Sequence, residues 1–458
     1  MSLWSRKSLR RSLQVGLGLA LAIGLVASQA FGWSESCFRP KASQPKNVVI
    51  LIGDGMGFNH VAAGAYWMYG CGHSLVYERF AQRLAMATWS ANNPAGYDPA
   101  QAWTVFNYVM SGATDSASAA TAMSTGVKNY DGTIGVDINY QPLVHLMQRA
   151  ELLGKATGVV TSVEFSHATP AGFVAHNKSR NNYTQIALEM IRDSACDVVM
   201  GCGHPEFDND AQPRPTPKYS YIGADTWDIL VNGVPCADAN GDGVQDPWVL
   251  VEDVRDFRRL MYGRAPERVC GVPKVYTTLQ QSRSGDAYAD PYVVPLNPDL
   301  PTLAEMSLGA LNVLDADEDG FVLMIEGGAI DWAAHGNQPG RLIEEQVDFN
   351  HAVEAVCRYL QRRGLWKETL VIVTGDHETG YLTGPGSDPD WTPIINNGPR
   401  RLPGMEFHSG DHTNSLVPFY AEGPGAAMFA AKATGWDPVH GAYLDNTEIH
   451  NVCWDLLN

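Results

Sequence analysis

The sequence is poor in positive charge and lacks several motifs that mark common classes of protein. Its 458 residues include 32 Lys and Arg against 50 Asp and Glu, and such an acidic surface repels nucleic acid and anionic membranes. No Cys-x-x-Cys pair suggests a zinc knuckle. The run Gly55-Met56-Gly57 lacks the third glycine of a dinucleotide fingerprint, and Ser116 has no Gly-x-Ser-x-Gly elbow. These absences disfavour a nucleic-acid partner, a dinucleotide cofactor and a Ser-His-Asp triad.

Residues 1–30 are typical of a secretory signal peptide. Four Arg and Lys residues precede an apolar run from Val15 to Val26, and small residues near Ala30 suit cleavage. The run is short for a membrane span, although a retained N-terminal anchor is the alternative. Cleavage removes four positive charges and no acidic residue, so the formal net charge changes from −18 to −22. We therefore expect a periplasmic or secreted mature chain, residues 31–458, without a membrane attachment.

Eight cysteines remain after this cleavage. An even count in an exported protein favours disulfide bonds, and the sequence alone leaves their connectivity open. Cys196 with Cys202 and Cys236 with Cys270 are close enough in the chain to be the first expected pairs.

Stretches rich in apolar and β-branched residues predict strands, and the uninterrupted runs among them, such as 321–325, are typical of buried parallel strands. They cover residues 47–52, 157–165, 197–201, 321–325, 369–374 and 416–421, the last of which we expect to be the final strand. Helical periodicity is found at 143–153 and 341–363. The predicted fold class is α/β, a three-layer sandwich with a central, mostly parallel sheet flanked by helices.

The segment 204–300 differs from the rest, because Pro, Asp and Tyr replace long periodic runs. We expect an inserted loop-rich subdomain or an extended set of loops over the site. Within it, Asp238 begins the first half of a calcium-loop pattern whose twelfth position is Val249. A second acidic loop, from Asp315 to Glu326, matches the full pattern, but its second half reads as a strand. An additional calcium ion is therefore kept as an alternative.

The stretch from Thr114 to Gly126 predicts a short helix that begins at Asp115 or Ser116 and ends at Gly126. This places the Ser116 hydroxyl at a helix N-terminus, where free N–H groups and the helix dipole stabilise an alkoxide or a phosphate. An isolated Asp-Ser pair is more often only an N-cap. The residues that follow the predicted strands favour a functional role.

Several predicted strands end in residues that bind metals, and the carboxyl ends of parallel strands meet at one edge of a sheet. Aspartate with imidazole favours zinc, whereas an all-oxygen set favours magnesium. Clustered cations would also let an acidic protein bind an anion. The residues are Asp54, His167, Thr169, Glu326, Asp331, His335, Asp376, His377 and His412.

Two further expectations concern histidine and arginine. His176 and Arg180 are spaced for one helix, and the Arg180 guanidinium is the best-placed candidate for phosphate. His408, four residues before His412, competes with it as a ligand.

Together these motifs resemble those of alkaline phosphatases. The likeness runs in order from about Lys46 to Trp454 and is loose over 204–300. Its motifs are Gly53-Asp54-Gly55-Met56-Gly57, Thr114-Asp115-Ser116-Ala117 to Lys128, Ala168-Thr169-Pro170-Ala171 with Ser179-Arg180, Glu326-Gly327-Gly328 with Asp331 and His335, Thr374-Gly375-Asp376-His377, and His412-Thr413.

The resemblance implies hydrolysis of small phosphate monoesters, with Ser116 as a nucleophile that becomes a phosphoserine. Asp115, Ser116 and Arg180 would bind the substrate, Arg180 through two phosphoryl oxygens. The implied metals are one zinc ion on Asp331, His335 and His412, a second on Asp54, Asp376 and His377 that also holds Ser116, and one magnesium ion on Asp54, Thr169 and Glu326. A homodimer is implied as well.

His167 and Trp332 depart from the best-known bacterial members, which have Asp and Lys there. His167 would lie beside the magnesium position or touch it. Two other functions stay open: a phosphodiesterase or sulfatase of the same superfamily, and an extracellular calcium-binding protein, suggested by the two acidic loops.

Overall fold

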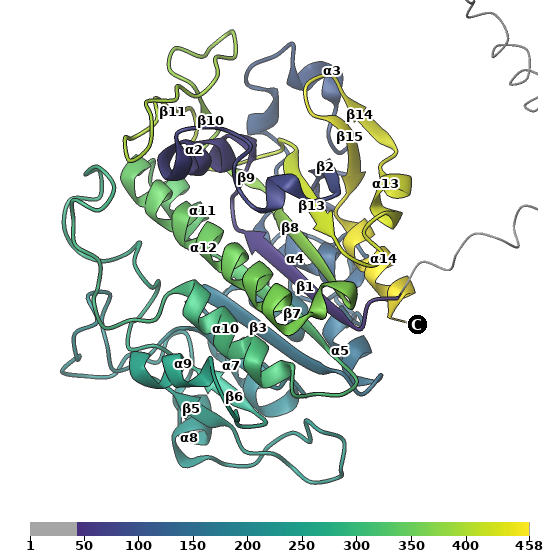
Figure 1. Ribbon diagram of the computed structural model, residues 1–458, viewed down its shortest axis with the longest axis vertical. Helices are drawn as coiled ribbons and strands as arrows, with labels where there is room; N and C mark the ends of the chain where they lie inside the picture. Colours follow the sequence, from purple (N-terminus) through teal and green to yellow (C-terminus); the bar gives the residue numbers. More distant parts are fainter. Residues whose placement is uncertain (1–43, 458) are drawn as a thin grey trace, which may run out of the picture. The chain divides into compact units, whose positions relative to one another are not determined.

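An 11-stranded sheet runs through the computed structural model, which describes residues 44–457 (Figure 1). The expected signal peptide and Cys37 lie outside the described residues. In spatial order the strands are β14 (Gly435–Asp437), β15 (Gly441–Asp445), β2 (Gln82–Ala87), β13 (Val417–Glu422), β8 (Thr369–Gly375), β1 (Asn47–Gly53), β7 (Phe321–Gly327), β3 (Ala156–Glu164), β4 (Val198–Cys202), β6 (Val269–Gly271) and β5 (Val249–Val251).

Parallel pairing dominates this sheet. β1 lies between β8 and β7 and is parallel to both, and the parallel arrangement continues through β3, β4, β6 and β5. β13 is antiparallel to β8 and to β2, and β14 is antiparallel to β15. Two short ladders lie outside the sheet: β9 (Glu378–Thr379) pairs with β12 (His412–Thr413), and β10 (Leu382–Thr383) pairs with β11 (Glu406–Phe407).

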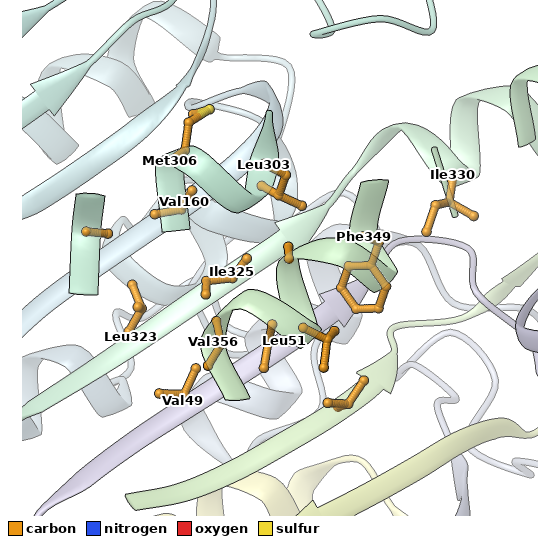
Figure 2. Close-up of a cluster of buried hydrophobic side chains, with 14 of the residues drawn as sticks. Val49, Leu51, Val160, Leu303, Met306, Leu323, Ile325, Ile330, Phe349 and Val356 are labelled. Carbon is orange, nitrogen blue, oxygen red and sulfur yellow. The ribbon is translucent and has the colours of Figure 1, made fainter. Parts of the chain in front are cut away.

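Side chains of β1 alternate between two hydrophobic cores, one on each face of the sheet. On one face, Val49 and Leu51 pack with Leu323, beneath the helices that carry Leu303 and Phe349 (Figure 2). On the other face, the alternate residues of β1 belong to the second core. The predicted α/β sandwich with a central, mostly parallel sheet is confirmed.

Helices cover both faces. α10 and α12 cross the near face of the sheet in Figure 1, whereas α4 and α5 lie behind it. The first face holds α2 (Phe58–Tyr69), α9 (Val254–Leu260), α10 (Leu303–Leu314), α11 (Ala329–His335) and α12 (Pro339–Arg363). The second holds α4 (Ser116–Thr125), α5 (Leu146–Glu151), α6 (Ala168–Val174), α7 (Tyr183–Leu188), α8 (Ala224–Asn232), α13 (Met428–Lys432) and α14 (Thr447–Leu456), while α3 (Pro99–Ala102) belongs to a small separate cluster. None of the helices between residues 44 and 457 has the length and apolar character needed to cross a bilayer.

The segment 204–300 is not made of loops alone. It contributes α8, α9 and the three-residue strands β5 and β6, which extend one edge of the main sheet. The rest of the segment runs without long regular elements.

Two expectations about elements were wrong. The strand at 416–421 exists as β13, but β14 and β15 follow it, so it is not the final strand. His176 and Arg180 do not share a helix, because α6 ends at Val174. The chain beyond it is held instead by backbone hydrogen bonds between Ile134 and Asn177, each 2.8 Å long.

The expected disulfide bonds are also absent among the described residues, where seven cysteines are free thiols. Cys196 precedes β4 and Cys202 ends it, so an extended strand separates them by about 20 Å, far more than a disulfide spans. The Cys236 thiol instead lies 3.2 Å from the Ile191 carbonyl, and Cys270 is buried within β6. Neither pair that is close in the sequence forms a disulfide.

Candidate active site

The N-terminus of α4 presents Ser116 as the sequence predicts. The Asp115 carboxylate caps the helix by accepting a hydrogen bond from the Ser118 N–H at 2.9 Å, and Gly126 ends it in a left-handed conformation with φ of 73°. Ser116 is buried, and its Oγ lies 3.2 Å from His377 Nε2. The hydroxyl therefore meets an imidazole that belongs to the set of predicted metal ligands.

Strand register explains how these residues meet. Gly53 at the end of β1 lies opposite Gly327 of β7 and Gly375 of β8, so Asp54 and Asp376 follow at the same level. Glu326 lies one residue earlier in β7, between β1 and β3. Loops and short elements then bring in the remaining side chains.

Potential ligand atoms fall into four overlapping groups, and within each group they lie within 4.8 Å of one another. Asp54, His377 and His412 each belong to two of the groups, so the four groups form one continuous set. Their members are Asp54 with Asp376 and His377, Asp331 with His377 and His412, His335 with Asp411 and His412, and Asp54 with His167 and Glu326.

Buried oxygens without partners show that this set suits cations. Both carboxylate oxygens of Asp54, Oδ2 of Asp376, Oε1 of Glu326 and Oγ1 of Thr169 are buried and have no hydrogen-bond partner. A buried carboxylate without a donor or a cation is strongly destabilising. The donor set of Asp54, Glu326 and Thr169 is all oxygen, as magnesium prefers, and the other groups combine carboxylate with imidazole, as zinc prefers.

The histidine nitrogens point to the same conclusion. His335 Nδ1 lies 2.7 Å from the Gly410 carbonyl, and His412 Nδ1 lies 2.9 Å from the Thr114 carbonyl. Carbonyls only accept, so each Nδ1 carries a proton, and in its neutral form each ring turns an Nε2 lone pair inward. Burial opposes a charge on His412, but its hydrogen bond with Asp331 raises its pKa to about 9, so a cation bound here would replace the proton on Nε2. These two Nε2 atoms are 3.0 Å apart, and Asp331 Oδ1 lies 3.4 and 3.5 Å from them. A cation between them would satisfy all three atoms.

Burial and the closeness of other carboxyl groups shift the pKa values of the carboxyl groups in the site. Burial, together with the charges of Asp376 and Asp331, raises the pKa of Asp54 well above its usual range. Burial likewise raises the pKa of Glu326 to about 7 and that of Asp376 to about 6. Burial also opposes the charge of Asp331, but its hydrogen bond with His412 and the neighbouring histidines lower its pKa. Bound cations would favour the charged form of every carboxylate here.

Arg180 is held at the site by Asp115. Its Nη1 donates to Asp115 Oδ2 at 2.9 Å, and its side chain is largely buried. The same carboxylate accepts from the Gly132 N–H at 2.9 Å, which fixes its orientation. Burial opposes the charge of both groups, yet each charge sustains the other, so the pKa of Asp115 is lowered and that of Arg180 is raised.

His167 takes part in the oxygen-rich group, but its ring has a defined orientation. Arg180 Nη2 lies 3.2 Å from His167 Nε2, and a guanidinium can only donate. The proton of the neutral ring is therefore on Nδ1, the buried atom that has no hydrogen-bond partner. Burial and Arg180 lower the pKa of His167 to about 3, which keeps the ring neutral. The ring is thus a neutral neighbour of Asp54 and Glu326, and Arg180 occupies its Nε2.

The structure brings all the sequence-predicted site residues to one place. His408 does not join them, because its Nε2 lies 2.7 Å from Thr383 Oγ1 and its ring packs against Phe106. Sequence reasoning missed Asp411, which stands directly before His412, and Thr379, two residues after His377. Their closeness to predicted ligands in the sequence was the available signal.

Comparisons with known proteins agree with this geometry. The family model described as Alkaline phosphatase matches residues 45–434. The chain is 30% identical over 418 residues to alkaline phosphatase H of Pseudomonas aeruginosa, covering 83% of this chain and 81% of that protein. It is 29% identical over 403 residues to alkaline phosphatase 3 of Bacillus subtilis, and this match covers 84% of this chain and 73% of that protein. The alkaline phosphatase of the Antarctic bacterium TAB5 is similar in structure, with a TM-score of 0.60, 25% identity, and coverage of 90% of this chain and 98% of that chain.

The fold and the site define an enzyme with a mostly parallel α/β sandwich in which a buried serine faces clustered carboxylates and histidines. The match of the family model to residues 45–434 identifies the family to which this enzyme belongs. The chain belongs to the alkaline phosphatase family and is an alkaline phosphatase hydrolase.

Proposed function

We propose that this protein hydrolyses small phosphate monoesters through a phosphoserine at Ser116. The observation that supports this most strongly is the position of Ser116 Oγ, 3.2 Å from His377 Nε2 at the N-terminus of α4. An alkoxide and a transferring phosphoryl group would both be stabilised there by free N–H groups and the helix dipole.

Arg180, Asp115 and Ser116 each have a different role in this reaction. Arg180 binds two oxygens of the phosphoryl group, and Asp115 keeps the guanidinium in place. Ser116 Oγ gives up its proton and forms a bond to phosphorus while the bond to the ester oxygen breaks, and the ester oxygen takes up a proton and leaves as the alcohol. A water oxygen then gives up a proton and forms a bond to phosphorus, the bond to Ser116 Oγ breaks and that oxygen regains a proton, and inorganic phosphate is released. Both displacements leave Arg180 paired with the phosphoryl oxygens.

We propose two zinc ions and one magnesium ion as the cofactors. Asp331, His335 and His412 would hold one zinc ion, and Asp54, Asp376 and His377, with Ser116, would hold the other. Asp54, Thr169 and Glu326 would hold magnesium, with His167 beside them. When bound, such ions stabilise the charge on the entering and leaving oxygens and lower the pKa of water. A variant of the TAB5 enzyme has a structure with Mg bound in its M3 site, which supports a third metal position.

The location and assembly of the protein are also proposals. The N-terminal sequence supports export to the periplasm or the medium, and the family likeness supports a homodimer. The mature chain would then act on phosphate monoesters outside the cytoplasm.

Replacement of Ser116 tests the mechanism. In the mature, zinc-loaded protein, Ser116→Ala should lower kcat for a chromogenic phosphate monoester by about a thousandfold or more, because the nucleophile is lost. Ser124→Ala is a matched control, since this buried serine of α4 bonds only to backbone carbonyls. Normal turnover by Ser116→Ala would reject the assignment. Faster hydrolysis of diesters or sulfate esters by the wild type would favour those activities instead.

A further inference from the structure

The hydroxyl of Thr379 lies between two groups of metal-binding residues. Its Oγ1 is 2.6 Å from Asp331 Oδ1 and 3.2 Å from His377 Nδ1. Thr379 is fully buried, so solvent does not compete for either contact. One hydroxyl thus connects the proposed ligands of two different zinc ions.

The chemistry of the three groups fixes the direction of both hydrogen bonds. An ionised carboxylate only accepts, so the single hydroxyl proton of Thr379 goes to Asp331. The hydroxyl oxygen is then free to accept from His377, which places the imidazole proton on Nδ1. The lone pair of His377 is therefore on Nε2, and this atom lies 3.5 Å from Asp54 Oδ1 and 3.3 Å from Asp376 Oδ2. Two acceptors and a lone pair facing one another suit a cation.

Thr379 differs from the groups that orient the other two histidines. His335 and His412 each bond to a main-chain carbonyl, which a substitution does not remove. The orientation of His377 depends on a side chain and can be changed by mutation.

The backbone holds Thr379 in place for this role. Its N–H donates to the Gly55 carbonyl at 3.1 Å, next to Asp54. In the β9–β12 ladder it lies directly opposite His412. Thr379 thus contacts or adjoins four chain segments that carry proposed zinc ligands.

We propose that Thr379 is a positioning residue for both zinc positions, and this proposal rests on the proposed function. It selects Nε2 of His377 as the metal-binding nitrogen and restrains the Asp331 carboxylate. Hydrogen-bonding partners of metal ligands set the ring tautomer and the ligand orientation, and their loss lowers metal affinity by about 10- to 100-fold.

The test compares zinc affinity in two variants, Thr379→Val and Thr379→Ser. Zn²⁺ alone is titrated into the mature, metal-stripped protein in competition with a chromogenic chelator. Thr379→Val keeps the shape and loses the hydroxyl, so we expect about 10- to 100-fold weaker binding, whereas Thr379→Ser should bind within about threefold of the wild type. Thr383→Val is the matched control, because it removes a buried hydroxyl that contacts His408 outside the metal groups.

Nitrogen NMR of the ¹⁵N-histidine-labelled, zinc-loaded wild type gives a second readout that requires no variant to fold. A proton on Nδ1 of His377 with zinc on Nε2 supports the proposal, and the reverse overturns it. Unchanged zinc affinity in Thr379→Val, or equally weak binding in Thr379→Ser, also overturns it. A wild type that binds zinc with this signature but does not hydrolyse monoesters would reject the proposed function alone, and one that binds no zinc would overturn both.

Discussion

At the residue scale, the burial of single charges sets how stability depends on pH. Lys128 follows α4 and its Nζ donates to the Trp89 carbonyl at 2.7 Å and to Asn446 Oδ1 at 2.6 Å. Burial lowers its pKa from 10.5 to about 8, although the ion pair with Asp445 at 3.1 Å opposes this shift. The folded chain therefore releases this proton at a lower pH than the unfolded chain does.

The lowered pKa of Lys128 makes the free energy of unfolding increase with pH. Between about pH 8 and 10.5 the unfolded lysine still holds a proton that the folded one has released, so raising the pH stabilises the fold. We expect the free energy of unfolding to rise by about 2 kcal/mol more between pH 7 and pH 10 in the wild type than in Lys128→Met. Denaturant unfolding of both proteins with a chelator present measures this difference. Identical pH dependence in the two proteins would contradict it.

Single residues of the site could be predicted when the sequence showed both a suitable side chain and its position at the end of a strand or the start of a helix. Ser116 follows a capping Asp, and Asp54 and Asp376 each follow an apolar run. Thr379 was not predictable, because a hydroxyl becomes a positioning group only when folding places two partners beside it.

At the element scale, α4 depends on how Gly126, the glycine that caps its C-terminus, packs. Gly126 has φ of 73°, and a Cβ there would lie 2.6 Å from His450 Nδ1 of α14. Gly364 ends α12 with φ of 72°, but a Cβ there would meet nothing within 4 Å. The two glycines share the strained conformation and differ in crowding.

This pair separates backbone strain from steric clash. Gly364→Ala should cost about 1 kcal/mol of stability through the left-handed conformation alone. Gly126→Ala should cost about 1 to 3 kcal/mol more, because His450 and α14 must move. Denaturant unfolding of both variants gives the comparison, and equal losses would show that the contact with His450 is relaxed without cost.

Strand prediction succeeded where burial was two-sided. β1, β3, β7 and β8 are buried along their full length, and β1, β7 and β8 each contain a continuous apolar run, whereas β3 also buries Thr161 and Ser162. β5 and β6 have only three residues each, and β2 begins with exposed or half-buried polar residues. Their pairing partners define them, and a local pattern does not show those partners.

At the scale of the whole molecule, the carboxylate cluster links stability to metal binding. Asp54, Glu326 and Asp376 are completely buried, so loss of hydration and then mutual repulsion destabilise their charged forms without cations. Chelation should therefore lower Tm, and zinc with magnesium should restore it, with about 4 kcal/mol gained when free metal is a thousandfold above Kd. Calorimetry with and without chelator measures the change. An unchanged Tm would show that the cluster is stable without ions.

The sequence predicted the sandwich and the edge where the site forms, but not how the segment 204–300 joins the sheet. Its strand β6 pairs with β4, about 70 residues earlier in the chain, and its cysteines form no disulfide despite their spacing. Both outcomes depend on long-range packing.

The order of the strands has one more consequence, for biosynthesis. The site draws on Asp54 near the beginning of the fold and on His412 near its end, and β1 reaches its neighbours β7 and β8 only after most of the chain exists. No fragment released early from the ribosome contains a complete site. Only finished molecules would therefore hold metal at every position of the site, and a chain truncated before His412 would lack at least the position that His412 completes.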